Sequence, residues 1–141
     1  MYTYDMLLRY AKRTKADVEV IGFSHEARPI LSFHVGSKSG RQIIICSAIH
    51  AREHITALLA VKLISRYVRK KSLPPCCGIY FIPMVNPDGA CLCEKGIDSI
   101  KSIWDREFLL KLNHGSEDFS LWKANSCGVD LNVNFDAEYG S

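Results

Sequence analysis

The sequence of 141 residues has no long apolar run and little net charge. No stretch reaches the roughly 18 apolar residues that a membrane-spanning helix needs, and residues 1–15 hold no apolar core ahead of a small-residue cleavage site. The 18 basic and 15 acidic residues leave a net charge of only +3, and the one basic cluster, at 66–71, closes a predicted helix. We therefore expect no membrane partner and no nucleic-acid partner, and we expect the chain as written to be cytoplasmic.

The sequence also lacks the cysteine spacing of a disulfide framework, although it contains six cysteines. Cys76 adjoins Cys77, and Cys91 is one residue from Cys93, so neither pair bridges easily. No secretory signal accompanies them. A structural zinc at Cys91 and Cys93 is the minor alternative, because no second cysteine or histidine pair lies close by in the sequence. We therefore expect free thiols.

The residues that are present predict an α/β domain. Apolar residues make up 48% of the chain and charged residues 23%, which is enough to bury a core. Apolar periodicity predicts helices over 4–15, 55–71 and 100–112, and strands over 18–23, 29–35, 42–47 and 78–84. The first two strands form a predicted hairpin, and the apolar run 42–47 is typical of a central strand buried on both faces.

Two polar segments complete the predicted organisation. The motif NPDG, at 86–89, follows the last predicted strand and predicts a turn. The segment 120–141 is rich in polar and turn-forming residues and is predicted to be a loop that lines a site.

A possible metal motif lies where a strand meets a helix. The strand 42–47, the helix 55–71 and the strand 78–84 predict a right-handed βαβ unit with parallel strands. His50 and Glu53, as H-x-x-E, fall at the carboxyl end of its first strand, where α/β sheets place ligands. A catalytic zinc takes three protein ligands and leaves one position open. Taken alone, these letters favour a simpler reading, in which Glu53 complements the helix dipole and His50 is a loop residue.

The same letters permit a second metal motif. H-x-x-E-H, from His50 to His54, is the inverzincin pattern, in which two histidines on one helix face bind zinc and the glutamate is the general base. This arrangement requires both histidines inside a helix, whereas the predicted strand runs almost to His50. We therefore rank the inverzincin arrangement second.

Several motifs together resemble those of the zinc carboxypeptidase family, typified by carboxypeptidase A. They are the opening YTYDMLL, EARPI, HARE at 50–53, NPDG at 86–89, WKAN at 122–125 and GVDLN at 128–132. WKAN with GVDLN is most similar to the bacterial branch that includes γ-D-glutamyl-diaminopimelate peptidases of cell-wall turnover. The resemblance runs from Tyr2 onward and implies one three-layer α/β sandwich with a mixed sheet, Zn²⁺ as cofactor, and a peptide or cell-wall peptide as substrate.

The resemblance also implies roles for five residues. His50 and Glu53 correspond to two zinc ligands, and Arg52 to an arginine that contacts the bound peptide. Lys123 occupies the place of an arginine that stabilises the oxyanion, a role that lysine can fill as a point charge. Asn132 corresponds to an asparagine that helps to hold the terminal carboxylate of the substrate. The simpler readings are a surface lysine for Lys123 and a turn-forming side chain for Asn132.

The sequence departs from the family pattern in two places. The family motif N-R-N reads Asn132-Val133-Asn134 here, so the charged hydrogen bond of its arginine, about 1.5 to 3 kcal/mol, is lost. No counterpart follows for the third zinc ligand, a histidine, or for the catalytic glutamate and tyrosine. We therefore expect 1–141 to be the N-terminal portion of one such domain, truncated before its C-terminal strands and helices.

Such a portion is expected to bind zinc weakly and to lack peptidase activity on its own. It is also expected to expose an unpaired sheet edge and to self-associate. The alternative is a non-catalytic remnant with a binding or structural role.

Overall fold

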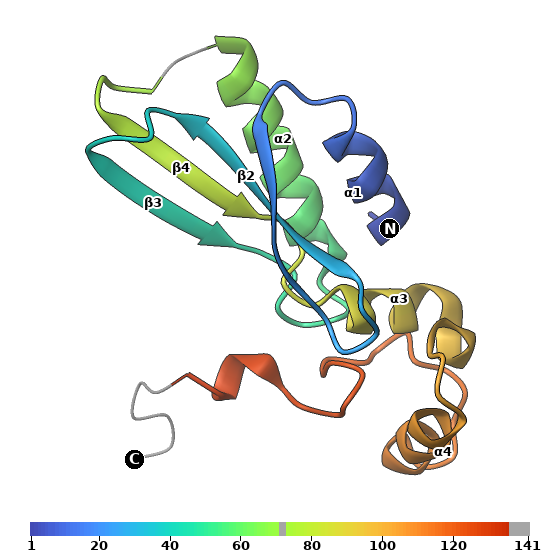
Figure 1. Ribbon diagram of the computed structural model, residues 1–141. Helices are drawn as coiled ribbons and strands as arrows, with labels where there is room; N and C mark the ends of the chain where they lie inside the picture. The colour runs from blue at the N-terminus through green and yellow to red at the C-terminus, as the bar shows by residue number, and fades with distance from the viewer. Residues whose placement is uncertain (71–72, 136–141) are drawn as a thin grey trace.

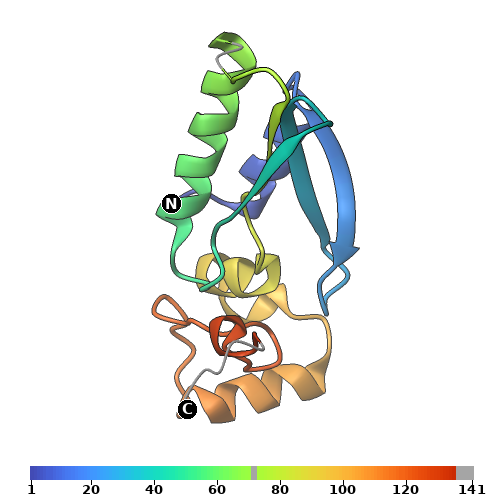
Figure 2. The same ribbon diagram turned by 90° about the vertical axis from the view of Figure 1, so that its left-hand side faces the viewer.

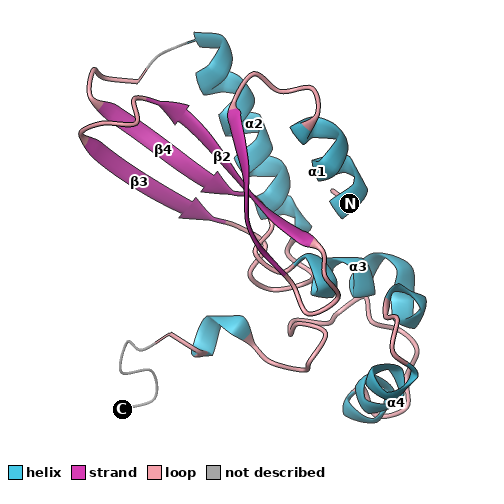
Figure 3. Ribbon diagram, in the orientation of Figure 1, coloured by secondary structure: helices cyan, strands magenta, loops and turns pink. Residues whose placement is uncertain are grey.

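The chain folds around one mixed four-stranded sheet in the computed structural model, which describes residues 1–70 and 73–135. The strands are β1 (Asp17–Phe23), β2 (Pro29–Gly36), β3 (Arg41–Cys46) and β4 (Cys77–Ile82). They lie in the order β1-β2-β4-β3, as Figures 1 and 3 show. β2 is antiparallel to both of its neighbours, whereas β3 and β4 are parallel.

The helices form two groups, one against the sheet and one beyond the carboxyl ends of β3 and β4 (Figures 1 and 2). The α-helices are α1 (Tyr4–Ala11), α2 (His54–Lys70), α3 (Pro87–Lys95) and α4 (Ile103–Leu112), and the 3₁₀ helices are η1 (Gly96–Ser99) and η2 (Leu131–Val133). α1 and α2 lie on the same side of the sheet (Figure 2). The elements from α3 onward lie beyond the carboxyl ends of β3 and β4 (Figure 1). No described helix is long and apolar enough to cross a membrane.

The core lies between the sheet and the two helices on its covered side. Its members include Phe33 of β2, Phe81 of β4 and Ile64 of α2, all fully buried. The buried apolar positions of α2 follow the spacing of one helical face: Ala57, Ala60, Val61 and Ile64. A smaller cluster beyond the sheet joins α3 and α4 through Leu92 and Leu109.

The predicted architecture is largely confirmed. All four predicted strands, the hairpin and the parallel βαβ unit are present, and the predicted helices at 55–71 and 100–112 correspond to α2 and α4. The first helix ends at Ala11, earlier than expected. Of the three layers of a carboxypeptidase-like sandwich, the described residues form the sheet and one helical layer, and no described helix covers the opposite face (Figure 2).

The prediction that NPDG forms a turn is wrong, because this motif begins α3. The side chain of Asn86 accepts a hydrogen bond from the N–H of Gly89, and Pro87 occupies the first helical position. Asparagine and proline favour helix starts for the reasons that they favour turns: a short side-chain acceptor and a fixed φ. The residues from Pro87 to Cys93 are all buried, and this burial favours the helix over the turn.

The prediction that 42–47 is a central strand is also not met within the described residues. β3 lies at the edge of the sheet, and Ile43 and Ile44 are 57% and 67% exposed. Within the described residues, only Ile45 of the three isoleucines of β3 packs against the core.

Candidate functional site

The candidate site lies where three loops meet beyond the carboxyl ends of the parallel strands. The N–H of Ala51 donates to the carbonyl of Lys123 at 2.9 Å, which joins the loop after β3 to the segment around residue 123. The buried amide of Asn86 donates to the carbonyls of Ile49 and Ala124, both at 3.1 Å. These bonds fix the backbone that carries the predicted site residues.

His50 lies between two carboxylates. Its Nδ1 is 2.8 Å from Oε1 of Glu53, and its Nε2 is 3.2 Å from Oδ1 of Asp130. His50 and Glu53 occupy a turn immediately before α2, closed by a hydrogen bond from the N–H of Glu53 to the carbonyl of His50. This turn brings the two side chains to the same side, and the imidazole is mostly buried.

This geometry fits a bound cation. A neutral imidazole carries one N–H, so it can donate to only one of the two carboxylates. If Asp130 receives the proton of Nε2, the lone pair of Nδ1 faces a carboxylate oxygen of Glu53. Two acceptors in contact repel each other unless a proton or a metal ion lies between them. A metal-bound histidine usually donates its other N–H to a carboxylate, which matches the position of Asp130.

Asp130 also connects His50 to Lys123. Nζ of Lys123 is 3.5 Å from Oδ2 of Asp130. The backbone N–H of Asn132 lowers the pKa of Asp130, and the positive charge of Lys123 lowers it further. Asp130 is therefore an ionised carboxylate that holds the imidazole and the ammonium group on its two oxygens.

Asp130 is not one of the sequence-predicted site residues, although it lies in the motif GVDLN. The signal that could have found it is the requirement of a metal-binding histidine for a carboxylate partner. No sequence spacing reveals this pair, since His50 and Asp130 are 80 positions apart.

The other predicted site residues lie around this centre. Lys123 contacts Asp130, which in turn contacts His50. Arg52 is exposed and donates from Nη1 to the carbonyl of Leu121 at 3.3 Å. Asn132 is exposed in η2, and its backbone N–H donates to Oδ1 of Asp130 at 3.0 Å. Among the described residues, the side chains of Arg52 and Asn132 make no hydrogen bond to His50 or Glu53.

His54 does not share a metal position with His50. His54 is the first residue of α2, whereas His50 lies outside the helix. Nδ1 of His54 is 3.2 Å from the carbonyl of Tyr2, and burial lowers the pKa of His54. The geometry therefore lacks the pair of histidines on one helix face that the inverzincin arrangement requires.

All six cysteines are free and lie within the described residues, as expected. Cys91 and Cys93 are buried on α3, and Sγ of Cys93 donates to the carbonyl of Trp122 at 3.5 Å. Burial raises the pKa of Cys93 to about 11 and also raises that of Cys91. Protonated, buried thiols of this kind pack in a core and are poor zinc ligands.

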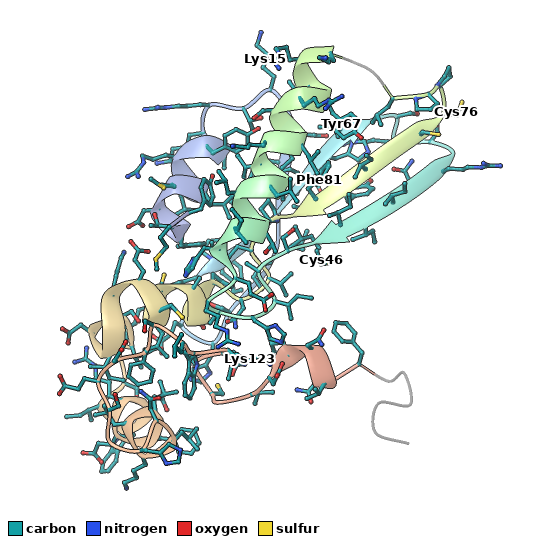
Figure 4. The ribbon with its side chains drawn as sticks, turned by 180° about the vertical axis from the view of Figure 1, so that it is seen from behind. Lys15, Cys46, Tyr67, Cys76, Phe81 and Lys123 are labelled. Atoms are coloured by element: carbon teal, nitrogen blue, oxygen red, sulfur yellow. The ribbon has the colours of Figure 1, made fainter. Side chains whose placement is uncertain are left out.

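One cleft within the described residues lies away from the candidate site. It has a volume of about 580 Å³ and is lined by residues that include Lys15, Tyr67 and Cys76. These three residues lie at one end of the sheet, whereas Lys123 lies beyond the other end, which is marked by Cys46 (Figure 4). The candidate site is therefore distinguished by its grouping of side chains and not by this cleft.

Comparison with known proteins identifies relatives along the whole chain. A family model described as zinc carboxypeptidase matches residues 2–141. Gamma-D-glutamyl-L-diamino acid endopeptidase 1 of Lysinibacillus sphaericus is 32% identical over 155 residues, which cover 98% of this chain and 38% of that protein. Metallocarboxypeptidase A of Trichophyton tonsurans is 35% identical over 88 residues, which cover 55% of this chain and 21% of that protein.

Solved structures share the fold. Carboxypeptidase A from Helicoverpa armigera matches with a TM-score of 0.66 at 22% identity, over 100% of this chain and 35% of that chain. A metallo-carboxypeptidase from Burkholderia cenocepacia matches with a TM-score of 0.67 at 17% identity, over 96% of this chain and 33% of that chain. This chain thus spans about a third of the length of these relatives. From Tyr2 onward, the chain belongs to the zinc carboxypeptidase family.

Proposed function

We propose that this chain binds Zn²⁺ through His50 and Glu53, and that it contributes this site to a peptidase that hydrolyses a peptide bond near a chain end. The observation that carries the proposal is the imidazole of His50, held 2.8 Å from Glu53 and 3.2 Å from Asp130. When bound, zinc activates a water molecule and polarises a carbonyl oxygen. The two ligands on this chain leave further positions of the ion open.

Asp130 prepares His50 for this role. Its ionised carboxylate holds the proton on Nε2, so that Nδ1 keeps its lone pair free on the side of Glu53. Since His50 is mostly buried, the ring cannot turn freely. The ligand atoms are therefore oriented before a metal ion arrives, which lowers the entropic cost of binding it.

Lys123 is proposed to stabilise negative charge on the oxygen of the scissile carbonyl. Its side chain is 45% exposed, and Nζ is 3.5 Å from Asp130, so the ammonium group can turn toward a substrate while it remains near this carboxylate. Arg52 and Asn132 are exposed and are proposed to contact the peptide.

A cell-wall peptide is the proposed substrate class, with an ordinary peptide C-terminus as the alternative. The relative from Lysinibacillus sphaericus is named for cleavage of gamma-D-glutamyl-L-diamino acid bonds. Val133 is 41% exposed next to Asn132, and it offers no charge to a terminal carboxylate. A substrate held mainly by its terminal carboxylate would therefore bind less tightly here than to an arginine.

For the chain on its own, we further propose self-association through β3. This strand carries Ile43 and Ile44, both more than half exposed, and no described strand pairs with its outer edge. Unpaired strand edges with apolar side chains favour pairing with a second chain.

The zinc content of the purified chain tests the metal proposal. We expect the His50→Ala variant to bind about one equivalent of Zn²⁺ fewer than the unmodified chain, as measured by competition with a chromogenic chelator, because the variant loses the one nitrogen ligand of the site. His114→Asn is the matched control, since His114 is an exposed histidine in a left-handed turn that asparagine tolerates.

Equal zinc content in the unmodified chain and the His50→Ala variant would rule out the proposed ligand. The absence of zinc from both would favour a non-catalytic role for this chain.

A further inference from the structure

A second group of metal-ligating side chains lies at the turn between β1 and β2. His25, Glu26 and Asp105 each offer one ligand atom, and these atoms all lie within 4.8 Å of one another. Nε2 of His25 is 3.3 Å from Oδ2 of Asp105. The group joins the β1–β2 turn to the first turn of α4 and shares no residue with the His50 site.

Glu26 is the unusual member of this group, because it is a carboxylate that is only 5% exposed. Its Oε2 accepts a hydrogen bond from the N–H of Lys101 at 3.0 Å. No described residue donates a hydrogen bond to Oε1. Oε1 is not fully enclosed by protein, so it is open to an ion that enters from solvent.

The charges around the group leave room for a cation. The neighbouring buried carboxylate, Asp88, is compensated by Arg28. Nζ of Lys101 donates to the backbone carbonyl of Glu26, so this cation is not paired directly with the carboxylate. Burial raises the pKa of the Cys127 thiol, and the charges of Asp105, Asp88 and Glu26 raise it further, as excess negative charge would.

We propose that His25, Glu26 and Asp105 form a second site, which binds a divalent transition-metal cation such as Zn²⁺. One imidazole and two carboxylates are a ligand set that zinc accepts, with water in the remaining position. His25 is half exposed, so the ion can enter from solvent, whereas Glu26 anchors it from the buried side. The ion would fasten the β1–β2 turn to α4 and so stabilise the folded chain.

The test uses the full chain in a background that lacks the first site. In the His50→Ala variant we expect about one remaining equivalent of Zn²⁺ and a rise in the thermal unfolding midpoint when Zn²⁺ is added. Introducing His25→Ala into this background should weaken binding at least tenfold and abolish the rise, because one of three ligands is lost. His114→Asn in the same background is the control and should change neither quantity.

The proposals for the two metal sites can be refuted independently of each other. His25→Ala alone should retain the equivalent that depends on His50. The second site is refuted if the His50→Ala variant binds no zinc, or if its zinc persists unchanged after His25→Ala. Because His25 is half exposed on a turn, its replacement should leave the circular dichroism spectrum unchanged, and this measurement separates a lost ligand from a lost fold.

Discussion

At the scale of single residues, Asp130 gives His50 its orientation. Both ring nitrogens of His50 have a carboxylate neighbour, but only the one beside Asp130 needs to carry a proton. The lowered pKa of Asp130 keeps this carboxylate charged. The orientation of the His50 ring and the position of its proton therefore depend on Asp130, which lies in a distant segment of the chain.

Replacement of Asp130 tests this dependence. We expect Asp130→Asn to weaken zinc binding at the His50 site by about 10- to 100-fold, because the amide no longer holds the Nε2 proton as an anionic acceptor. The measurement is a Zn²⁺ titration in the His25→Ala background, so that only the His50 site responds. Glu117→Gln, at an exposed acid in the loop after α4, should leave the affinity unchanged. Equal affinities for Asp130→Asn and this control would contradict the proposed role.

At the scale of elements, the start of α3 holds the site loops together. Asp88, in the first turn of α3, is 2% exposed and accepts hydrogen bonds from Ser24, from the N–H of Glu26 and from Ser126. It also forms an ion pair with Arg28. One buried carboxylate thus joins α3 to the β1–β2 turn and to the loop that leads to Asp130.

This network predicts a large stability effect. Asp88→Asn should lower the free energy of unfolding by about 3 kcal/mol, because it leaves the mostly buried guanidinium of Arg28 without a counter-ion. Urea unfolding at pH 7 measures the change. Asp98→Asn is the matched control: Asp98 is 88% exposed in its pair with Arg106, so its loss should cost at most about 1 kcal/mol. Similar losses in the two variants would show that Asp88 is not the junction that we describe.

At the scale of the whole molecule, the described helices cover only one face of the sheet (Figure 2). α1 and α2 cover the side that carries Phe33 and Phe81, while β3 forms a free edge (Figures 1 and 2). The chain spans about a third of the length of these relatives. Its association behaviour can be measured directly.

A charge on β3 should reduce self-association. We expect the unmodified chain to sediment as more than a monomer and to bind an apolar dye, and we expect Ile44→Lys to shift the chain toward the monomer, because a lysine on an edge strand opposes pairing. Ile103→Lys is the control, since Ile103 is 66% exposed, close to the 67% of Ile44, but lies on α4. A monomeric unmodified chain without dye binding would refute the proposal.

The sequence by itself determined the four strands, the helices α1, α2 and α4, the parallel βαβ unit and the family motifs. Each of these depends on residues close together in the chain: apolar spacing in α2, the run in β3, and HARE at the end of that strand. It also identified His50 and Glu53 as neighbours, because three positions in a turn bring two side chains together.

Only the tertiary structure decided which carboxylate holds His50, that NPDG begins a helix, and that β3 lies at an edge. Asp130 reaches His50 across 80 positions, and the burial of α3 depends on segments far from it in the sequence. Local patterns are ambiguous in such cases, since the same asparagine and proline serve turns and helix starts, and the same apolar run serves central and edge strands. Contacts between distant segments resolve the ambiguity, because burial and pairing depend on what lies alongside in space.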